Sequence, residues 1–362
     1  MNTIFPEIKK NFGFGCMRLP VNGDEVDYVE FSKMIDTFLA NGFNYFDTAV
    51  FYVDGKSEKA LGDCLAARYP RESFVLADKL SNISFKCKED IEPWINTQLK
   101  TCGVEYFDFY LMHAQRADIY AQYKDNCAYE EAFRLKKEGK LRHVGISFHD
   151  NAEFLEKILT DYPEIEFVQL QFNYVDYEDE RVQSRLCYEV CVKHGKPVFV
   201  MEPVKGGQLV NMSEPMGKIV DDLGGGSRAS YAIRFAASFP NVVMVLSGMG
   251  NMDMMNDNIS AMKDFCPLNE KEMEALQKAA AIYHGEGQIP CTGCRYCVDD
   301  CPQQIPIPDI FAAVNKGKNN GETVDLEKIP GGKAADCVNC GKCQKNCPQF
   351  LPIRSLLRKI SR

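Results

Sequence analysis

Residues 74–113 read FVLADKLSNISFKCKEDIEPWINTQLKTCGVEYFDFYLMH, and this stretch contains one complete strand–helix–strand unit. The runs FVLADK at 74–79 and FDFYLMH at 107–113 carry the β-branched and aromatic side chains typical of buried strands. Between them, residues 88–102 form an amphipathic segment with a helical period. A helix between two strands is the usual crossover between parallel neighbours in a sheet. The stretch therefore predicts a parallel α/β fold.

The same alternation extends over about the first 285 residues. Eight strand candidates occur there, and amphipathic segments such as 28–41, 152–161 and 227–238 lie between them. Eight such units favour an α/β fold of the (β/α)8 TIM-barrel type. A doubly wound open sheet is the alternative, but the G-x-G-x-x-G turn that usually marks it is absent. The other six strand candidates are FGFGCM at 12–17, FNYFD at 43–47, HVGIS at 143–147, FVQLQFN at 167–173, PVFVMEP at 197–203 and VVMVLSG at 242–248.

Composition limits the classes of partner. The chain has 362 residues, of which 45% are hydrophobic and 26% charged, and its formal net charge is −9. This balance is typical of a globular protein, and the negative charge argues against non-specific nucleic-acid binding. No apolar run of about 18 residues and no signal-peptide pattern occurs. We therefore expect a cytoplasmic protein that binds neither nucleic acid nor membrane.

Half of the sixteen cysteines are clustered near the C-terminal end. They form the runs CTGCRYCVDDCP at 291–302 and CVNCGKCQKNCP at 337–348. Three cysteines at intervals of three, followed by Cys-Pro, are typical of ferredoxins with two 4Fe-4S clusters, in which the fourth cysteine ligates the other cluster. The sequence therefore predicts one cluster on Cys291, Cys294, Cys297 and Cys347, and a second on Cys337, Cys340, Cys343 and Cys301.

A zinc site is the alternative for these cysteines, but zinc usually takes two separated pairs of ligands rather than two runs of four. The connection between the runs is long for a compact ferredoxin. Residues 310–316 read as a short helix and residues 318–333 as a polar loop, which favours a mainly helical variant of the ferredoxin-like domain. We expect residues 1–284 to form the barrel and residues 285–362 the ferredoxin-type domain.

Polar residues end several of the predicted strands. Asp47, Lys79 and His113 close three of them, and Tyr52 follows Asp47 by five residues. Each has an ordinary explanation alone, such as a helix cap for the aspartate or a solvated charge for the lysine. Active sites of these barrels lie at the C-terminal ends of the strands, where all four would meet. We therefore predict that they form a catalytic group; Ser147, Gln169 and Asn173 end later strands.

With this group in place, residues 10–265 resemble the aldo-keto reductase family. The motifs are FGFGCMRLP, FDTAVFY, VLADK, FDFYLMH, GKLRHVGIS, VQLQFNY and VVMVLSGM. The resemblance implies that Asp47, Tyr52, Lys79 and His113 are the catalytic residues of a carbonyl reductase or alcohol dehydrogenase. The complete chain resembles the branch of the family that bears a C-terminal ferredoxin module. The resemblance also implies that NAD(P)H is held by Ser147, Gln169, Met201, Gly206, Gly207, Ser247, Gly248, Met249 and Asn258.

Carbonyl reduction requires a hydride at carbon and a proton at oxygen. Tyr52 would supply the proton, and we expect the Lys79 ammonium to lower the pKa of its phenol from the usual value of about 10. Asp47 would hold Lys79, and His113 would orient the substrate carbonyl. Where relatives that bind NADP place basic residues, residues 247–258 read SGMGNMDMMNDN without Lys or Arg. The sequence therefore favours NADH over NADPH.

These observations predict an oxidoreductase that acts on a small carbonyl or alcohol and carries two clusters for electron transfer. A hydride carrier normally needs a flavin to divide its electron pair between one-electron centres, so a flavin, or a redox partner protein, stays open. Two other functions stay open as well. The first is an electron-transfer protein with a degenerate barrel, and the second is a reductase whose clusters are structural or sensory.

Overall fold

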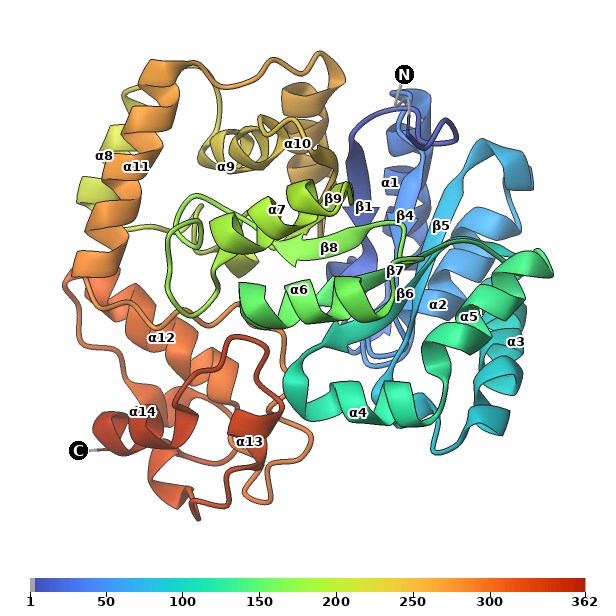
Figure 1. Ribbon diagram of the computed structural model, residues 1–362. Coiled ribbons are helices and arrows are strands. Elements are labelled where there is room, and N and C mark those ends of the chain that lie inside the picture. The colour runs from blue at the N-terminus through green and yellow to red at the C-terminus, as the bar shows by residue number, and fades with distance from the viewer. Residues whose placement is uncertain (1–3, 362) are drawn as a thin grey trace.

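A computed structural model describes residues 4–361, and a closed barrel of eight parallel strands forms its centre (Figure 1). The strands neighbour one another in the order β1-β10-β9-β8-β7-β6-β5-β4, and β1 also pairs with β4. All eight predicted strands are confirmed. Their bounds are β1 Phe12–Gly15, β4 Tyr45–Asp47, β5 Val75–Leu80, β6 Phe107–Gln115, β7 Leu141–Phe148, β8 Val168–Gln171, β9 Val198–Met201 and β10 Val242–Gly248. A short hairpin, β2 Val21–Asn22 and β3 Glu25–Val26, lies outside the barrel.

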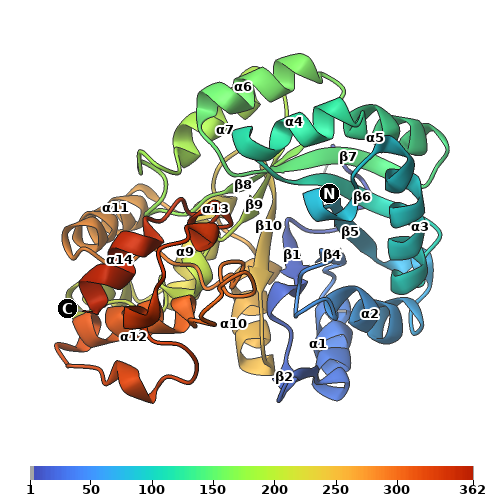
Figure 2. The same cartoon turned by 90° about the horizontal axis from the view of Figure 1, so that it is seen from below.

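Helices follow the strands and surround the barrel, as the view from below shows (Figure 2). Asn151 and Asn269 begin two of them by accepting a hydrogen bond from a backbone N–H in the first turn, as helix-capping residues do. The bounds are α1 Tyr28–Ala40, α2 Ser57–Leu61, α3 Ile91–Cys102, α4 Ala117–Asp125, α5 Ala128–Lys137, α6 Ala152–Asp161, α7 Ser184–Lys193, α8 Glu214–Asp221, α9 Arg228–Ala237, α10 Met252–Lys263 and α11 Glu270–Gly285.

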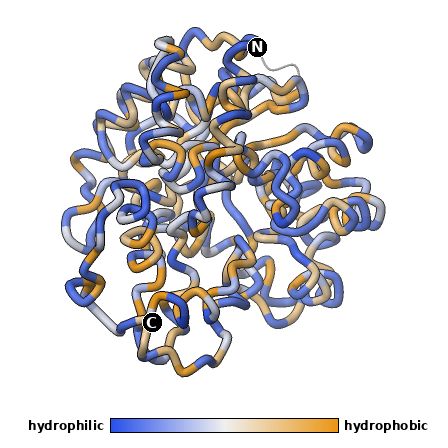
Figure 3. The backbone as a smooth tube through the Cα atoms, turned by 90° about the vertical axis from the view of Figure 1, so that its left-hand side faces the viewer, coloured by the Kyte–Doolittle hydropathy of each residue, from blue (hydrophilic) through white to orange (hydrophobic). Residues whose placement is uncertain are grey.

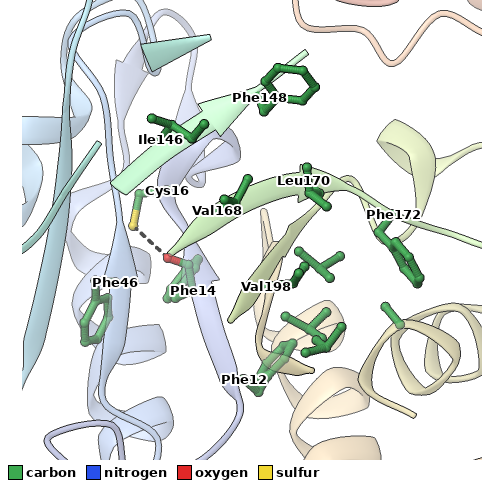
Figure 4. Packing of buried hydrophobic residues seen from close by; sticks show 14 of the residues in the cluster. Phe12, Phe14, Cys16, Phe46, Ile146, Phe148, Val168, Leu170, Phe172 and Val198 are labelled. Atoms are coloured by element: carbon green, nitrogen blue, oxygen red, sulfur yellow. Dashed lines mark hydrogen bonds between the residues drawn. The ribbon is translucent and has the colours of Figure 1, made fainter. Parts of the chain in front are cut away.

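Alternation along each strand separates two packed layers. Outward-facing side chains such as Phe14, Phe46 and Leu170 belong to the layer between strands and helices (Figure 4). Inward-facing residues such as Tyr45 and Phe109 fill the barrel interior. Successive side chains of a strand point to opposite faces, so alternate residues enter the barrel interior and the layer beneath the helices.

The C-terminal segment is mainly helical, as predicted. It contains α12 Ile307–Asn320, α13 Lys342–Lys345 and α14 Ile353–Ile360, and no strand lies between residues 286 and 361. The prediction of a short helix at 310–316 was too narrow, because α12 begins with Pro308 in its first turn and ends at Gly321, which adopts a left-handed conformation. The expected loop at 318–333 therefore starts only after residue 320.

The C-terminal segment packs against the barrel next to α4 and the ends of β8 and β9 (Figures 1 and 2). The side-chain amides of Gln171 and Gln349 exchange two hydrogen bonds of 2.9 and 2.7 Å, and both residues are buried. Arg18 Nη2 donates to the Thr292 carbonyl at 2.6 Å. These polar contacts join the C-terminal segment to the barrel.

Hydrophilic and hydrophobic stretches alternate in short runs along the chain (Figure 3). Among residues 4–361, no helix combines the length and the apolar character needed to span a membrane.

Candidate active site and cluster-binding segment

Three of the predicted catalytic side chains point into the barrel from the ends of their strands. Asp47, Lys79 and His113 each follow inward-facing residues two positions earlier, Tyr45, Ala77 and Leu111. In the barrel register Asp47 lies beside Ala77, and Lys79 beside Leu111. All three are buried at the C-terminal ends of their strands, where TIM-barrel active sites lie.

Lys79 and Asp47 form a buried ion pair. Lys79 Nζ lies 2.6 Å from Asp47 Oδ1, and the two side chains are 1% and 3% exposed. The ammonium also donates to the Thr48 carbonyl at 2.6 Å. The second carboxylate oxygen of Asp47 accepts a hydrogen bond from Gln169 Nε2 at 3.3 Å. The charges are therefore paired and hydrogen-bonded, which is the condition for keeping them in a low-dielectric interior.

Tyr52 lies in the loop between β4 and α2, half-buried above this pair. The Lys79 ammonium lies 4.8 Å from the centre of its ring. Burial raises the pKa of the Tyr52 phenol well above its ordinary value, and the carboxylates of Asp47 and Glu202 raise it further. The expectation of a lowered pKa was therefore wrong, because burial and the carboxylates raise it, and the cation that lowers it in part is Arg18. Tyr52 is held as a neutral phenol that can donate a proton.

His113 is a neutral imidazole in this site. Burial lowers its pKa well below the ordinary value, and the charge of Lys79 lowers it further. Its Nδ1 lies 2.6 Å from Ser81 Oγ. When Ser81 donates to Nδ1, the ring proton is on Nε2 and is available to a substrate oxygen. Tyr123 donates a hydrogen bond to the Leu80 carbonyl at 2.7 Å, and its hydroxyl also lies 3.2 Å from the His113 carbonyl, so it supports the backbone there.

A cavity of about 680 Å³ extends from this group across the end of the barrel. It is lined by Asp47, Tyr52 and His113, whereas Lys79 lies behind Asp47 and does not line it. Of the predicted cofactor residues, Met249 is the exception: its side chain is buried in the hydrophobic core and does not line the cavity. The cavity wall contains the others, namely Ser147, Gln169, Met201, Gly206, Gly207, Ser247, Gly248 and Asn258.

The cavity wall contains a glycine turn after β9. Gly206 and Gly207 have φ of 61° and 93°, in the left-handed region that favours glycine. A Cβ at Gly206 would lie 2.1 Å from the Thr292 carbonyl oxygen, so the turn and the segment at Cys291 are in direct contact. This contact ties the wall of the cavity to the first cysteine run.

The far end of the cavity is lined by Asp253 and Asp257. Arg228 also lines it, but its guanidinium pairs with Asp221 at 2.6 Å. Arg234, which lies on α9 with Arg228, pairs with Glu272. Both arginines are therefore engaged by carboxylates, and Arg18, which also lines the cavity, donates to the Thr292 carbonyl.

The eight cysteines of the C-terminal runs gather around two small voids. One void is lined by Cys291, Cys294, Cys297 and Cys347, and the other by Cys301, Cys337, Cys340 and Cys343. This grouping is the crossed one expected from the spacing. Within residues 4–361, no three His, Cys, Asp or Glu side chains stand close enough together to hold a single metal ion. Four thiols spread around an apolar void suit the larger 4Fe-4S cluster, whose irons each take one thiolate.

Several cavity residues escaped the sequence reasoning because they come together only in the folded chain. Cys294, Tyr296 and Gln349 line the same cavity as Tyr52, so one cysteine group borders the catalytic end. Glu202 also lines it and has φ of 58°, an uncommon conformation for a non-glycine residue. Burial raises the pKa of Glu202, while the nearby Arg18 lowers it in part. The position of Tyr296 between two predicted ligands was the one available sequence signal.

Comparison with known proteins identifies both parts of the chain. The model of the Aldo/keto reductase family matches residues 11–281, and that of the 4Fe-4S dicluster domain matches residues 290–351. The "Uncharacterized oxidoreductase YqkF" of Bacillus subtilis is 24% identical over 310 residues, covering 73% of this chain and 90% of the relative. The "NADH-specific methylglyoxal reductase" of Escherichia coli is 28% identical over 221 residues, covering 54% of this chain and 62% of the relative.

Solved structures show the same fold. The aldo-keto reductase of Klebsiella pneumoniae in complex with NADPH superposes with a TM-score of 0.61 at 19% identity, covering 74% of this chain and 90% of that chain. The barrel, the strand-end residues and the family match agree. The chain belongs to the aldo/keto reductase family of oxidoreductases and carries a C-terminal 4Fe-4S dicluster domain.

Proposed function

We propose that the protein reduces a small carbonyl compound, or oxidises the corresponding alcohol, with NADH, and that it holds two 4Fe-4S clusters for electron transfer. The observation that carries the proposal is the shared cavity, which is lined by Tyr52 and His113 of the barrel and by Cys294 of the first cysteine run. A cluster on Cys294 would therefore lie beside the reacting group rather than at a remote site. We place the boundary between the two domains at residues 284 and 285.

The chain's own residues account for the movement of the proton. Tyr52, whose pKa is raised, stays protonated at neutral pH and donates to the carbonyl oxygen. Lys79, 4.8 Å from the ring centre, stabilises the negative charge left on the phenol oxygen. Neutral His113 donates a hydrogen bond to the same carbonyl oxygen and orients the substrate. Asp47 holds Lys79 in place.

When bound, a reduced nicotinamide supplies two electrons as a hydride, whereas each cluster carries one electron. Gln169 and Ser147 would bind the carboxamide, and Met201 would pack on the nicotinamide ring. The glycine turn at 206–207 lets the pyrophosphate approach the backbone closely. The volume of about 680 Å³ is within the range of about 300–1,000 Å³ usual for ligand pockets.

The nucleotide preference follows from the far end of the cavity. Asp253 and Asp257 can accept hydrogen bonds from the free ribose hydroxyls of NADH, but they would repel the 2′-phosphate of NADPH. The Escherichia coli relative is named as NADH-specific, whereas the Klebsiella pneumoniae structure contains NADPH. The acidic lining therefore supports NADH for this chain.

The cluster assignment rests on the two cysteine groups around their voids. Transfer between a two-electron and a one-electron carrier would need a flavin or a redox partner, and we include both among the candidate components. All sixteen cysteines are free, as is usual in a reducing compartment, which supports a cytoplasmic location.

Anaerobic purification followed by a carbonyl panel tests the proposal. We expect iron and sulfide for two clusters per chain, and oxidation of NADH faster than of NADPH. Tyr52→Phe should lower kcat by about 10²–10⁴-fold because it removes the proton donor, while the cluster absorbance stays unchanged. Tyr69→Phe is the matched control, because Tyr69 lies on the outer surface and bonds Asp36.

Full activity of Tyr52→Phe would remove the proposed proton donor. Absence of carbonyl reduction with either nucleotide, together with cluster reduction by a viologen dye, would instead favour an electron-transfer protein with a degenerate barrel. Intact NADH-linked turnover in Cys294→Ala, with dye-linked turnover also retained, would contradict electron transfer through the nearer cluster.

A further inference from the structure

Charge is unevenly distributed along this acidic chain. Residues 333–361 contain six Lys or Arg and one Asp, although the whole chain has a net charge of −9. The segment includes the second cysteine run and α14. The excess of cations is therefore concentrated around the cysteine group of Cys301, Cys337, Cys340 and Cys343, which we call the outer group.

The outer group reaches the surface. Cys340 is exposed, and Val338 beside it has 58% of its side chain in solvent. Asn339 between them has φ of 60°, which turns the chain outward at this point. The other group, in contrast, borders the catalytic cavity through Cys294. The two groups therefore face different surroundings, one toward solvent and one toward the cavity.

Basic residues lie on the two helices that follow the exposed cysteine, α13 and α14. Lys342 and Lys345 lie on α13 between Cys340 and Cys347, and both are exposed. Arg354 lines the void of the outer group, with Nη1 3.5 Å from the Asn339 carbonyl. Arg358 lies one turn further along α14, also exposed. We call these four cations on α13 and α14 the basic collar.

The collar is not neutralised within the chain. Among residues 4–361, no carboxylate lies within ion-pair distance of Lys342, Lys345, Arg354 or Arg358. The acidic residue nearest in sequence is Asp336, whose carboxylate accepts a hydrogen bond from the Lys333 backbone N–H. Unpaired like charges around an exposed apolar residue are typical of a surface that binds an oppositely charged partner.

We propose that the basic collar docks an acidic one-electron carrier protein, which delivers electrons to the cluster of the outer group. The inference rests on the proposed function, since it requires the two clusters. In each encounter the reduced carrier loses one electron and the outer cluster gains one; no bond is made or broken.

A protein carrier fits better than a nucleic acid or a lipid surface. Val338 is exposed, and the cations lie on α13 and α14 in the same segment; an apolar centre with a charged rim is the usual composition of a protein interface. The remaining surface is acidic and would repel an acidic carrier elsewhere, so the field of the whole protein favours docking at the collar.

The test measures binding of two acidic carriers, a ferredoxin and a flavodoxin, to the anaerobic holoprotein by biolayer interferometry. Lys342→Glu/Lys345→Glu should weaken both dissociation constants at least tenfold at low ionic strength. Lys271→Glu/Lys278→Glu on α11 changes the net charge equally at exposed lysines far from the collar, and should weaken binding less than threefold. Rising salt should reduce binding of the wild type toward that of the collar variant.

Three results would overturn the inference. These are binding of neither acidic carrier to the wild type, equal weakening by the control pair, and tighter binding of single-stranded RNA or anionic vesicles than of the carriers at the collar. Iron content and NADH-linked carbonyl reduction are measured on the same samples. If carbonyl reduction fails in samples that contain the expected iron and whose collar still binds the carriers, the proposed enzyme activity is wrong and the docking surface stands; if the iron is absent, the inference fails with the proposed function.

Discussion

Replacing Lys79 by methionine removes one half of the buried ion pair at the centre of the site. Asp47 would keep its negative charge in the interior with one remaining donor, Gln169 Nε2 at 3.3 Å. Loss of one partner of a buried pair costs about 3–5 kcal/mol. The Thr48 carbonyl also loses its donor, which adds roughly 1 kcal/mol. Since domains are stable by about 5–15 kcal/mol, Lys79→Met should remove a large part of the stability.

A second substitution should restore part of the stability lost in Lys79→Met. Asp47→Asn in the Lys79→Met background removes the unpaired charge and keeps the shape of the side chain. The double variant should therefore be more stable than Lys79→Met alone by about 2 kcal/mol, while neither variant reduces carbonyls at a useful rate.

The single tryptophan provides the assay. Trp94 lies on α3, so its fluorescence reports on the barrel and not on the cluster domain. Guanidinium unfolding under anaerobic conditions gives the midpoints of the wild type, the two single variants and the double variant. A midpoint for Lys79→Met close to that of the wild type, or a double variant no more stable than Lys79→Met, would refute the assigned pairing.

Two further predictions concern His143 in the barrel and Gly206 in the cavity wall. Burial lowers the pKa of His143, but hydrogen bonds with Glu166 and Glu7 outweigh it and raise the pKa to about 9. The stabilisation is complete below about pH 6.5 and is lost as pH rises through 9. His143→Gln should therefore be destabilising at pH 6 and nearly neutral at pH 10 in thermal unfolding. Gly206→Ala should release iron faster and raise the KM for NADH, because the new Cβ would collide with the Thr292 carbonyl next to Cys291. Gly195→Ala is the control, since Gly195 also has a left-handed conformation but has no atom within 4 Å of the new Cβ, and it should change neither quantity. Equal iron loss from both variants would contradict the packing argument.

The strands and the positions of three candidate catalytic side chains could be predicted because both depend on local pattern. Alternation fixed the inner face of each strand, so Asp47, Lys79 and His113 were expected at one rim, and they lie there. The grouping of the cysteines followed in the same way from their spacing. In both cases the spacing of residues along the chain determines which side chains lie together in the fold.

The missed features depend on segments far apart in the chain. Tyr296 and Gln349 reach the cavity through the packing of the C-terminal segment on β8, which no local pattern encodes. Met249 was assigned to the cofactor by position, but its side chain enters the hydrophobic core. The predicted direction of the pKa shift of Tyr52 was wrong, because the sequence showed the lysine but not the degree of burial or the nearness of Glu202.

The most direct test of the shared cavity is the electron paramagnetic resonance spectrum of the dithionite-reduced protein with and without NADH. Because Cys294 borders the cavity and Cys340 faces solvent, NADH at saturation should change the signal of one cluster and leave the other as it was. Glu202→Gln, which changes a charge in the cavity, should alter the same signal. If saturating NADH changes neither signal, the nucleotide and the cluster do not share this cavity.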